Sequence, residues 1–279
     1  MKPPILPSLL LLLLIPVGRS AAQQGFDSKQ AELRVWARLK TMTPSDLQTV
    51  IAKAQGGDAE AQCWVGLVYG EGRLVPKDAE EAARWFLKSA EQGYAPAQRF
   101  YGLMSARVNP SAGEGWMRRA AEQGDAEAQF WLGFSYERNW FGTTDVKEAV
   151  KWYQKAAEGG NPDAQVSLGQ KYEDGEGVEQ SFKLAAEWYR NAAEHVPDLG
   201  GAGQGRNQLG ILYMEGRGVP QDYGQAYFWF SLNAPEGNAA DAKSHLAPLQ
   251  IREIDRIVKE WKEQHRVSPE LAAALHIEN

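Results

Sequence analysis

The sequence of 279 residues holds little of the chemistry on which enzymes and metalloproteins depend. Its four histidines show no His-Glu-x-x-His motif or comparable metal-ligand spacing. Neither a Gly-x-Ser-x-Gly nucleophile elbow nor a Ser-x-x-Lys motif is present, and these are common signatures of acyl-transfer enzymes. We therefore expect no catalytic residue, no bound metal and no cofactor.

Cysteine is nearly absent as well, since Cys63 is the only one. A chain with a single thiol has no internal disulfide, so its fold must depend on packing. Two roles for Cys63 remain open: a bridge to another chain, and a small apolar side chain inside the fold.

The sequence has no excess of basic residues, with 30 Lys and Arg against 36 Asp and Glu and a net charge of −6. A negatively charged protein is repelled by phosphate backbones and by anionic lipid surfaces. We therefore expect no nucleic-acid partner and no binding to an anionic membrane.

Long apolar runs are missing except near the N-terminus, where Leu9–Val17 is shorter than the ~18 residues that cross a bilayer. Lys2 precedes this run and Ser20-Ala21-Ala22 follows it, which is the order of a secretory signal and its small-residue cleavage site. A transmembrane anchor is the alternative. The pattern predicts a signal peptide over residues 1–22, export to the periplasm or the extracellular space, and no integral membrane segment after cleavage. Loss of Lys2 and Arg19 would change the net charge from −6 to −8.

Repetition is what the sequence has in abundance. The stretch Ala61–Gly93 is typical of a helical hairpin, with two apolar stripes at a period of 3.6 residues, a break at Gly72 and Pro76, and an N-cap at Asp78. A glycine in the first half and a tryptophan in the second half recur in five copies. The glycines are Gly66, Gly102, Gly133, Gly169 and Gly210, and the tryptophans are Trp85, Trp116, Trp152, Trp188 and Trp229. The tryptophans are 31, 36, 36 and 41 residues apart, so the period of 36 is shortened once and lengthened once.

The copies resemble a known family. The pattern L-G-x-x-Y-x-x-G-x-G-V is followed from Leu168 to Val178 and again from Leu209 to Val219, and an acidic cap and K-A-x-x-W come after it in the repeat. This pattern resembles the Sel-like repeat (SLR), a relative of the tetratricopeptide repeat, over roughly residues 58 to 245. The second copy departs from it at Ser105, which replaces the tyrosine, and the third at Asn139 and Phe141, which replace loop glycines.

The resemblance implies an all-α fold, a right-handed α-solenoid of helical hairpins whose concave face binds other proteins. Family members often serve as adaptors in secretion, envelope or signalling assemblies. The chain then divides into a signal peptide, N-terminal capping helices, five repeats with a degenerate half-repeat, and a C-terminal capping helix with a tail. The boundaries are 1–22, 23–57, 58–245 and 246–279, and the repeats span 58–93, 94–124, 125–160, 161–201 and 202–237.

The longest spacing contains the glycine-rich segment 195–205, HVPDLGGAGQG. No strand precedes these glycines and their spacing matches no nucleotide-binding fingerprint, so a flexible connector is expected rather than a phosphate loop.

A helical wheel divides each first helix into a buried side and an opposite side. By resemblance to tetratricopeptide repeats, the opposite side lines the concave groove. We expect it to bind a protein or peptide through residues that stand at matching positions in successive copies: Leu67, Arg99, Leu103, Phe130, Phe134, Gln170 and Ile211. The five repeat tryptophans are expected in the core. Trp64, Trp131 and Trp140 lie off the pattern, Trp140 in an atypical loop. Trp64, Phe100 and Trp131 are assigned either to packing between copies or to a ligand surface.

These observations favour an exported scaffold or adaptor that binds a peptide or protein partner in its concave face. The alternative is a hydrolase of cell-envelope material, related to peptidoglycan or β-lactam chemistry.

Overall fold

The computed structural model describes residues 35–195, 200–233 and 237–265, and these contain helices and turns but no strand. Residues 35–41 are helical, and α3 spans Pro44–Gln55. Five hairpins follow, and two final helices complete the fold. The hairpins are α4 (Ala59–Glu71) with α5 (Ala79–Glu91), α6 (Ala95–Ser105) with α7 (Pro110–Glu122), α8 (Ala126–Arg138) with α9 (Val146–Glu158), α10 (Pro162–Asp174) with α11 (Phe182–Ala193), and α12 (Ala202–Glu215) with α13 (Tyr223–Asn233); the final helices are α14 (Asn238–Ser244) and α15 (Pro248–Gln264).

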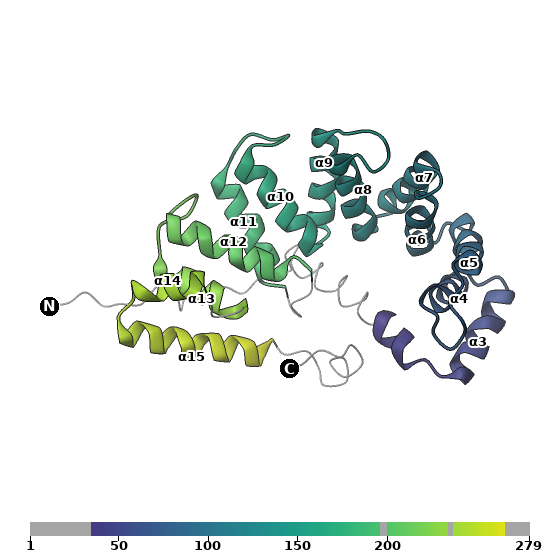
Figure 1. The fold of residues 1–279 in the computed structure, drawn as a ribbon, viewed down its shortest axis with the longest axis horizontal. Helices are drawn as coiled ribbons and strands as arrows, with labels where there is room; N and C mark the ends of the chain where they lie inside the picture. Colours follow the sequence, from purple (N-terminus) through teal and green to yellow (C-terminus); the bar gives the residue numbers. More distant parts are fainter. Residues whose placement is uncertain (1–34, 196–199, 234–236, 266–279) are drawn as a thin grey trace.

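The hairpins stack into an arc with α3 near one end and α15 at the other (Figure 1). The first helices α4, α6 and α8 lie on the inner side of the arc, and the second helices α5, α7 and α9 lie on the outer side. From α3 to α14 each helix packs on the next helix along the chain, and α15 packs on α13, so the core continues from hairpin to hairpin. The fold is therefore an all-α solenoid.

Helix boundaries follow from capping residues in repeat register. Seven residues before each repeat tryptophan stands a side chain that accepts hydrogen bonds from the first-turn backbone N–H groups of the second helix: Asp78, Asn109, Asp145, Ser181 and Asp222. Four first helices end at a residue in the left-handed conformation. Three of these are glycines and the fourth is Asn139, with φ 58°, because asparagine tolerates this region better than other side chains. The third copy thus keeps the helix end although it lacks the glycine.

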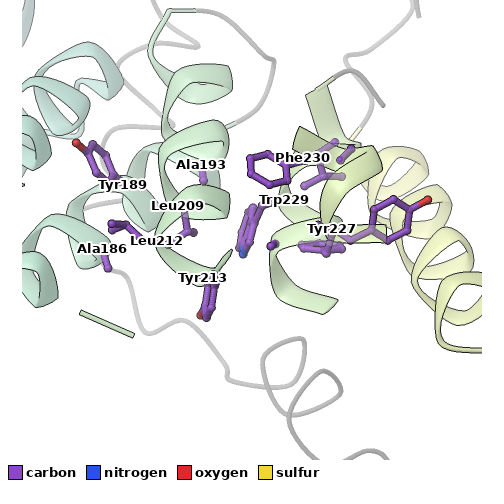
Figure 2. Packing of buried hydrophobic residues seen from close by; sticks show 14 of the residues in the cluster. Ala186, Tyr189, Ala193, Leu209, Leu212, Tyr213, Tyr227, Trp229 and Phe230 are labelled. Carbon is purple, nitrogen blue, oxygen red and sulfur yellow. The ribbon is translucent and has the colours of Figure 1, made fainter. Parts of the chain in front are cut away.

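In four of the five hairpins the centre is a close contact between the repeat glycine and a ring on the second helix, whereas Gly102 of the second hairpin approaches the backbone of α7 at Gly113 and Met117. A Cβ atom at Gly66, Gly133, Gly169 or Gly210 would lie only 2.5–2.7 Å from the ring of Phe86, Tyr153, Tyr189 or Phe230, respectively. These four rings are each 5% exposed or less. Figure 2 shows part of this core, where Trp229 and Phe230 of α13 lie beside Leu209 and Tyr213 of α12. Glycine is therefore needed at this position because the ring fills the space of a side chain.

The prediction that all five repeat tryptophans lie in the core is wrong for three of them. Trp152 and Trp229 are buried, but Trp85, Trp116 and Trp188 are only partly buried. The reason is that the glycine leaves space opposite the residue that follows the tryptophan, and the tryptophan itself lies about 100° further round the helix. In three copies a cation from three residues further on lies over the tryptophan ring: Lys88 over Trp85, Arg119 over Trp116 and Lys155 over Trp152, at 4.5, 4.5 and 4.1 Å from the ring centroid.

Adjacent copies are joined by a buried glutamine near the start of each first helix. Its side-chain amide donates to a carbonyl oxygen at the C-terminal end of the preceding helix, where backbone acceptors have no partner within the helix. The pairs are Gln62 with Ala54, Gln98 with Ala90, Gln129 with Ala121 and Gln165 with Ala157, at 2.9–3.1 Å. This bond accounts for the recurring Ala-Gln pair in the sequence.

A second link joins the third copy to the fourth. The Tyr153 hydroxyl donates to Glu137 at 2.6 Å, and Glu137 also accepts from the Lys171 ammonium of the next copy at 2.7 Å. The fourth copy repeats the arrangement with Tyr189, Glu173 and Arg217. Burial alone would raise the pKa of Glu137, but the hydrogen bonds from Lys171 and Tyr153 outweigh it and hold this pKa below its ordinary value.

The glycine–ring contact predicts opposite effects for two helical glycines. Gly169→Ala places a methyl group 2.5 Å from the buried Tyr189 ring and should destabilise the protein by roughly 1–3 kcal/mol. Gly115→Ala, in the exposed part of α7 with nothing within 4 Å, should stabilise it by about 0.5–1 kcal/mol through helix propensity. Urea unfolding measures both, and stabilisation by both changes would contradict the contact.

The Tyr153–Glu137–Lys171 link predicts an acid-dependent loss of stability. A carboxylate with a lowered folded pKa stabilises the fold above its unfolded pKa of about 4.3, and this contribution disappears as the pH falls through the folded pKa. Glu137→Gln should therefore cost about 1–3 kcal/mol at pH 7 and progressively less below pH ~4. The control is Glu158→Gln, an exposed carboxylate bonded to Gln154. A stability difference for Glu137→Gln that stays constant from pH 7 to pH 3 would refute the role of its charge.

Candidate functional site

The residues predicted to line the concave face stand at matching positions on the first helices, and the structure buries them to different degrees. Leu67 and Arg99 are buried, at 5% and 9% exposed. The remaining five are partly buried: Leu103, Phe130, Phe134, Gln170 and Ile211. The expectation that Leu67 lies on an open surface is therefore wrong.

The helix at residues 35–41 is the reason. It lies on the inner side of the arc, in purple, near α4 (Figure 1). Its Leu39 is 3% exposed and belongs to the same hydrophobic cluster as Cys63 and Leu67, and the Arg38 guanidinium lies 4.8 Å from the centroid of the Trp64 ring. As a result, α4 is buried without interruption from Ala61 to Val68. The chain itself covers the inner face of the first copy.

A pocket of about 400 Å³ begins where this cover ends. Its walls come from residues 35 and 36, from α4 and α6, and from the N-terminal ends of α8 and α10. The apolar part includes Trp36, Leu67 and Phe100. The polar part includes Arg99, whose guanidinium lies 3.2 Å from the Asp125 carboxylate and 4.5 Å from the centroid of the Phe100 ring. Volume and lining suit an apolar group that is flanked by polar atoms.

Four half-buried aromatic side chains form a patch on α8 and the loop after it: Phe130, Trp131, Phe134 and Trp140. Trp131 contacts the other three in edge-to-face geometry, with ring centroids 5.4–5.9 Å apart. Phe130 also lies 5.9 Å from Tyr153, so part of its area stabilises the hairpin. Phe130 therefore contributes to the fold of its own hairpin. The ring contacts of Trp131, Phe134 and Trp140 lie within α8 and the loop after it.

Cys63 lines the pocket but is 4% exposed and unpaired with another cysteine. Burial raises the pKa of its thiol to about 12, so the reactive thiolate is suppressed at neutral pH. This environment is that of an apolar side chain. Within the part of the chain that the structure describes, no three His, Cys, Asp or Glu side chains are grouped to hold a metal.

Two predictions concern the chain outside the hairpins. The predicted signal peptide, residues 1–22, lies outside the described residues. None of the helices within residues 35–195, 200–233 and 237–265 is long and apolar enough to cross a membrane.

The expected flexible connector 195–205 is shorter than predicted, because α12 already begins at Ala202 and both Ala202 and Gly205 are buried. Residues 196–199 of that segment lie outside the description. The sequence missed the helix start because its glycines, which suggest a loop, instead allow close approach: a Cβ atom at Gly205 would lie 2.7 Å from Ala192.

Comparisons with known proteins agree with this architecture. The family model of the Sel1 repeat matches residues 59–94, 97–125, 126–161, 162–195 and 204–232. No curated protein sequence matches the chain.

Among solved structures, the chain is 29% identical to a protective antigen of uropathogenic Escherichia coli that displays an SLR fold, with a TM-score of 0.69 over 84% of this chain and 51% of that one. It is 28% identical to a Sel1 repeat protein from Oxalobacter formigenes, with a TM-score of 0.61 over 76% of this chain and 59% of that one. The chain thus spans between half and two thirds of these relatives. Since the repeat model covers more than half of its residues, this chain belongs to the Sel1-repeat family.

Proposed function

We propose that the chain is an exported adaptor that binds a segment of another protein on the inner face of its solenoid. Sel1-repeat proteins are generally scaffolds for protein–protein interaction rather than enzymes. Export is inferred from the signal-like segment 1–22. Binding on the inner face is inferred from the aromatic patch of the third copy.

The aromatic patch supports binding because most of its side chains are not part of the repeat pattern. At the positions of Phe130, Trp131 and Phe134 the fourth copy has Val166, Ser167 and Gln170, and its glycine–ring contact is the same. Half-buried tryptophan and phenylalanine side chains are the groups that most often anchor protein interfaces. Leu103, partly buried on the preceding first helix, extends the apolar surface toward the second copy.

A photo-crosslinking residue introduced at Phe134 in the full chain tests this proposal. In a native cell extract it should form adducts with a partner, while the same residue at Val108, 90% exposed on the turn before α7, should not. An added Leu103→Asn substitution should lower the adduct yield at least fivefold, because it removes an apolar anchor while it keeps the branched shape of the side chain.

Two results would count against the proposal. Equal adducts at Phe134 and Val108 would indicate nonspecific contact. Turnover of a chromogenic β-lactam or of peptidoglycan by the purified chain would favour the envelope hydrolase.

A further inference from the structure

The helix at residues 35–41 shows what chemistry the inner face accepts. Its sequence is Val-Trp-Ala-Arg-Leu-Lys-Thr. Val35, Trp36 and Leu39 pack on the first copy, and Arg38 stacks over Trp64. An apolar helical stripe with a neighbouring basic residue is therefore already seated on this face.

The pocket beyond this helix offers the same two features. Its apolar wall continues from Trp64 and Leu67 to Phe100, and its lining carries three carboxylates against one cation. The carboxylates are Glu60, Asp125 and Glu127, and the cation is Arg99. Arg99 is bound to Asp125, and Glu127 accepts a hydrogen bond from the Asn161 side chain at 2.8 Å, so the charged groups of the lining keep a net negative sum. Glu60 is the most exposed of these carboxylates and bonds to the Trp64 indole N–H at 3.3 Å.

An anionic ligand is disfavoured although two helices begin at this pocket. The N-terminus of a helix attracts negative charge. At α8 this position is filled by the Asp125 side chain, which caps the helix, with Glu127 in the first turn. At α10 Asn161 caps the helix and Asp163 lies in the first turn. The chain therefore supplies the negative charge itself, and a carboxylate on a ligand would meet repulsion.

We propose that the inner face from the pocket to the aromatic patch binds a partner segment of apolar and basic character, the chemistry of residues 35–41. This inference rests on the proposed function, since it names the class of segment that the inner face takes. Aromatic or aliphatic side chains at helical spacing enter the pocket and cover Leu103 and Phe134, and a lysine or arginine beside them faces Glu60 and Glu127. Apolar anchors at i, i+3 and i+4 are the usual way in which a helix lies in a groove.

Fluorescence anisotropy with the full chain and two labelled peptides tests the inference. The basic probe is Arg-Val-Trp-Ala-Arg-Leu-Lys-Thr, the sequence of residues 34–41, and the acidic probe carries Glu in place of both Arg residues and the Lys. The basic probe should bind at least tenfold more tightly, and its affinity should fall as salt is raised because exposed charges are screened. The double change Glu60→Gln with Glu127→Gln should weaken it at least threefold and reduce the salt dependence. Glu122→Gln on the outer helix α7 should leave it unchanged.

Variants of the apolar surface distinguish the proposed site from simple exchange with the chain's own helix. Leu103→Asn should weaken the basic probe at least fivefold. If instead Trp36→Ala strengthens binding and Leu103→Asn has no effect, the peptide replaces residues 35–41 on the first copy and the inference is wrong. Equal binding of the acidic probe, or no binding of the basic probe, overturns it as well. If any of these results is found but the crosslinking residue at Phe134 still forms adducts, the preference for a basic segment is wrong and the proposed function is still supported.

Discussion

The close approach of a glycine to a buried ring is the contact on which this structure depends. Gly169 lets α10 lie directly on Tyr189 of α11, and the same pairing recurs at Gly66, Gly133 and Gly210. It sets the separation of the two helices in a hairpin, so successive hairpins have nearly the same shape. Copies of similar shape stack into the arc, and a buried glutamine joins each of the first four copies to the helix before it.

The same contact explains why the inner face is free to vary. The glycine–ring contact does not set the identity of the residue three positions before each glycine. That position is Cys63, Arg99, Phe130, Val166 and Asn207 in the five copies. A position that ranges from arginine to phenylalanine within one chain is where individual copies acquire their own chemistry, and the aromatic patch of the third copy is one result.

Much of the fold is predictable from local sequence, because caps and glycines act over a few residues. Asp78 and Asp145 cap their helices as expected, and Thr43 forms a capping box with Asp46 at the start of α3. The site was less predictable, because it depends on contacts between distant segments. Leu67 and Leu103 stand at the same position of the repeat. Residues 35–41 cover Leu67, which is buried, whereas Leu103 is only partly buried. Three of the repeat tryptophans were also predicted incorrectly. Their size suggested a place in the core, but the space beside the repeat glycine is filled by the smaller residue that follows each tryptophan.

The two ends of the solenoid are each covered by a helix of the same chain. At the C-terminal end Arg206 replaces the repeat glutamine and, at 2% exposed, donates to the carbonyl oxygens of Ala193 and His195. The longer arginine spans the wider spacing between the fourth and fifth copies, and its guanidinium also lies 5.0 Å from the centroid of the Trp261 ring on α15. At the N-terminal end Trp36 packs on the core of the first copy in the same way. Since both terminal copies are covered by helices of the same chain, the partly buried apolar side chains of the inner side that remain between them stand on α6 and α8, where Leu103, Phe130 and Phe134 lie.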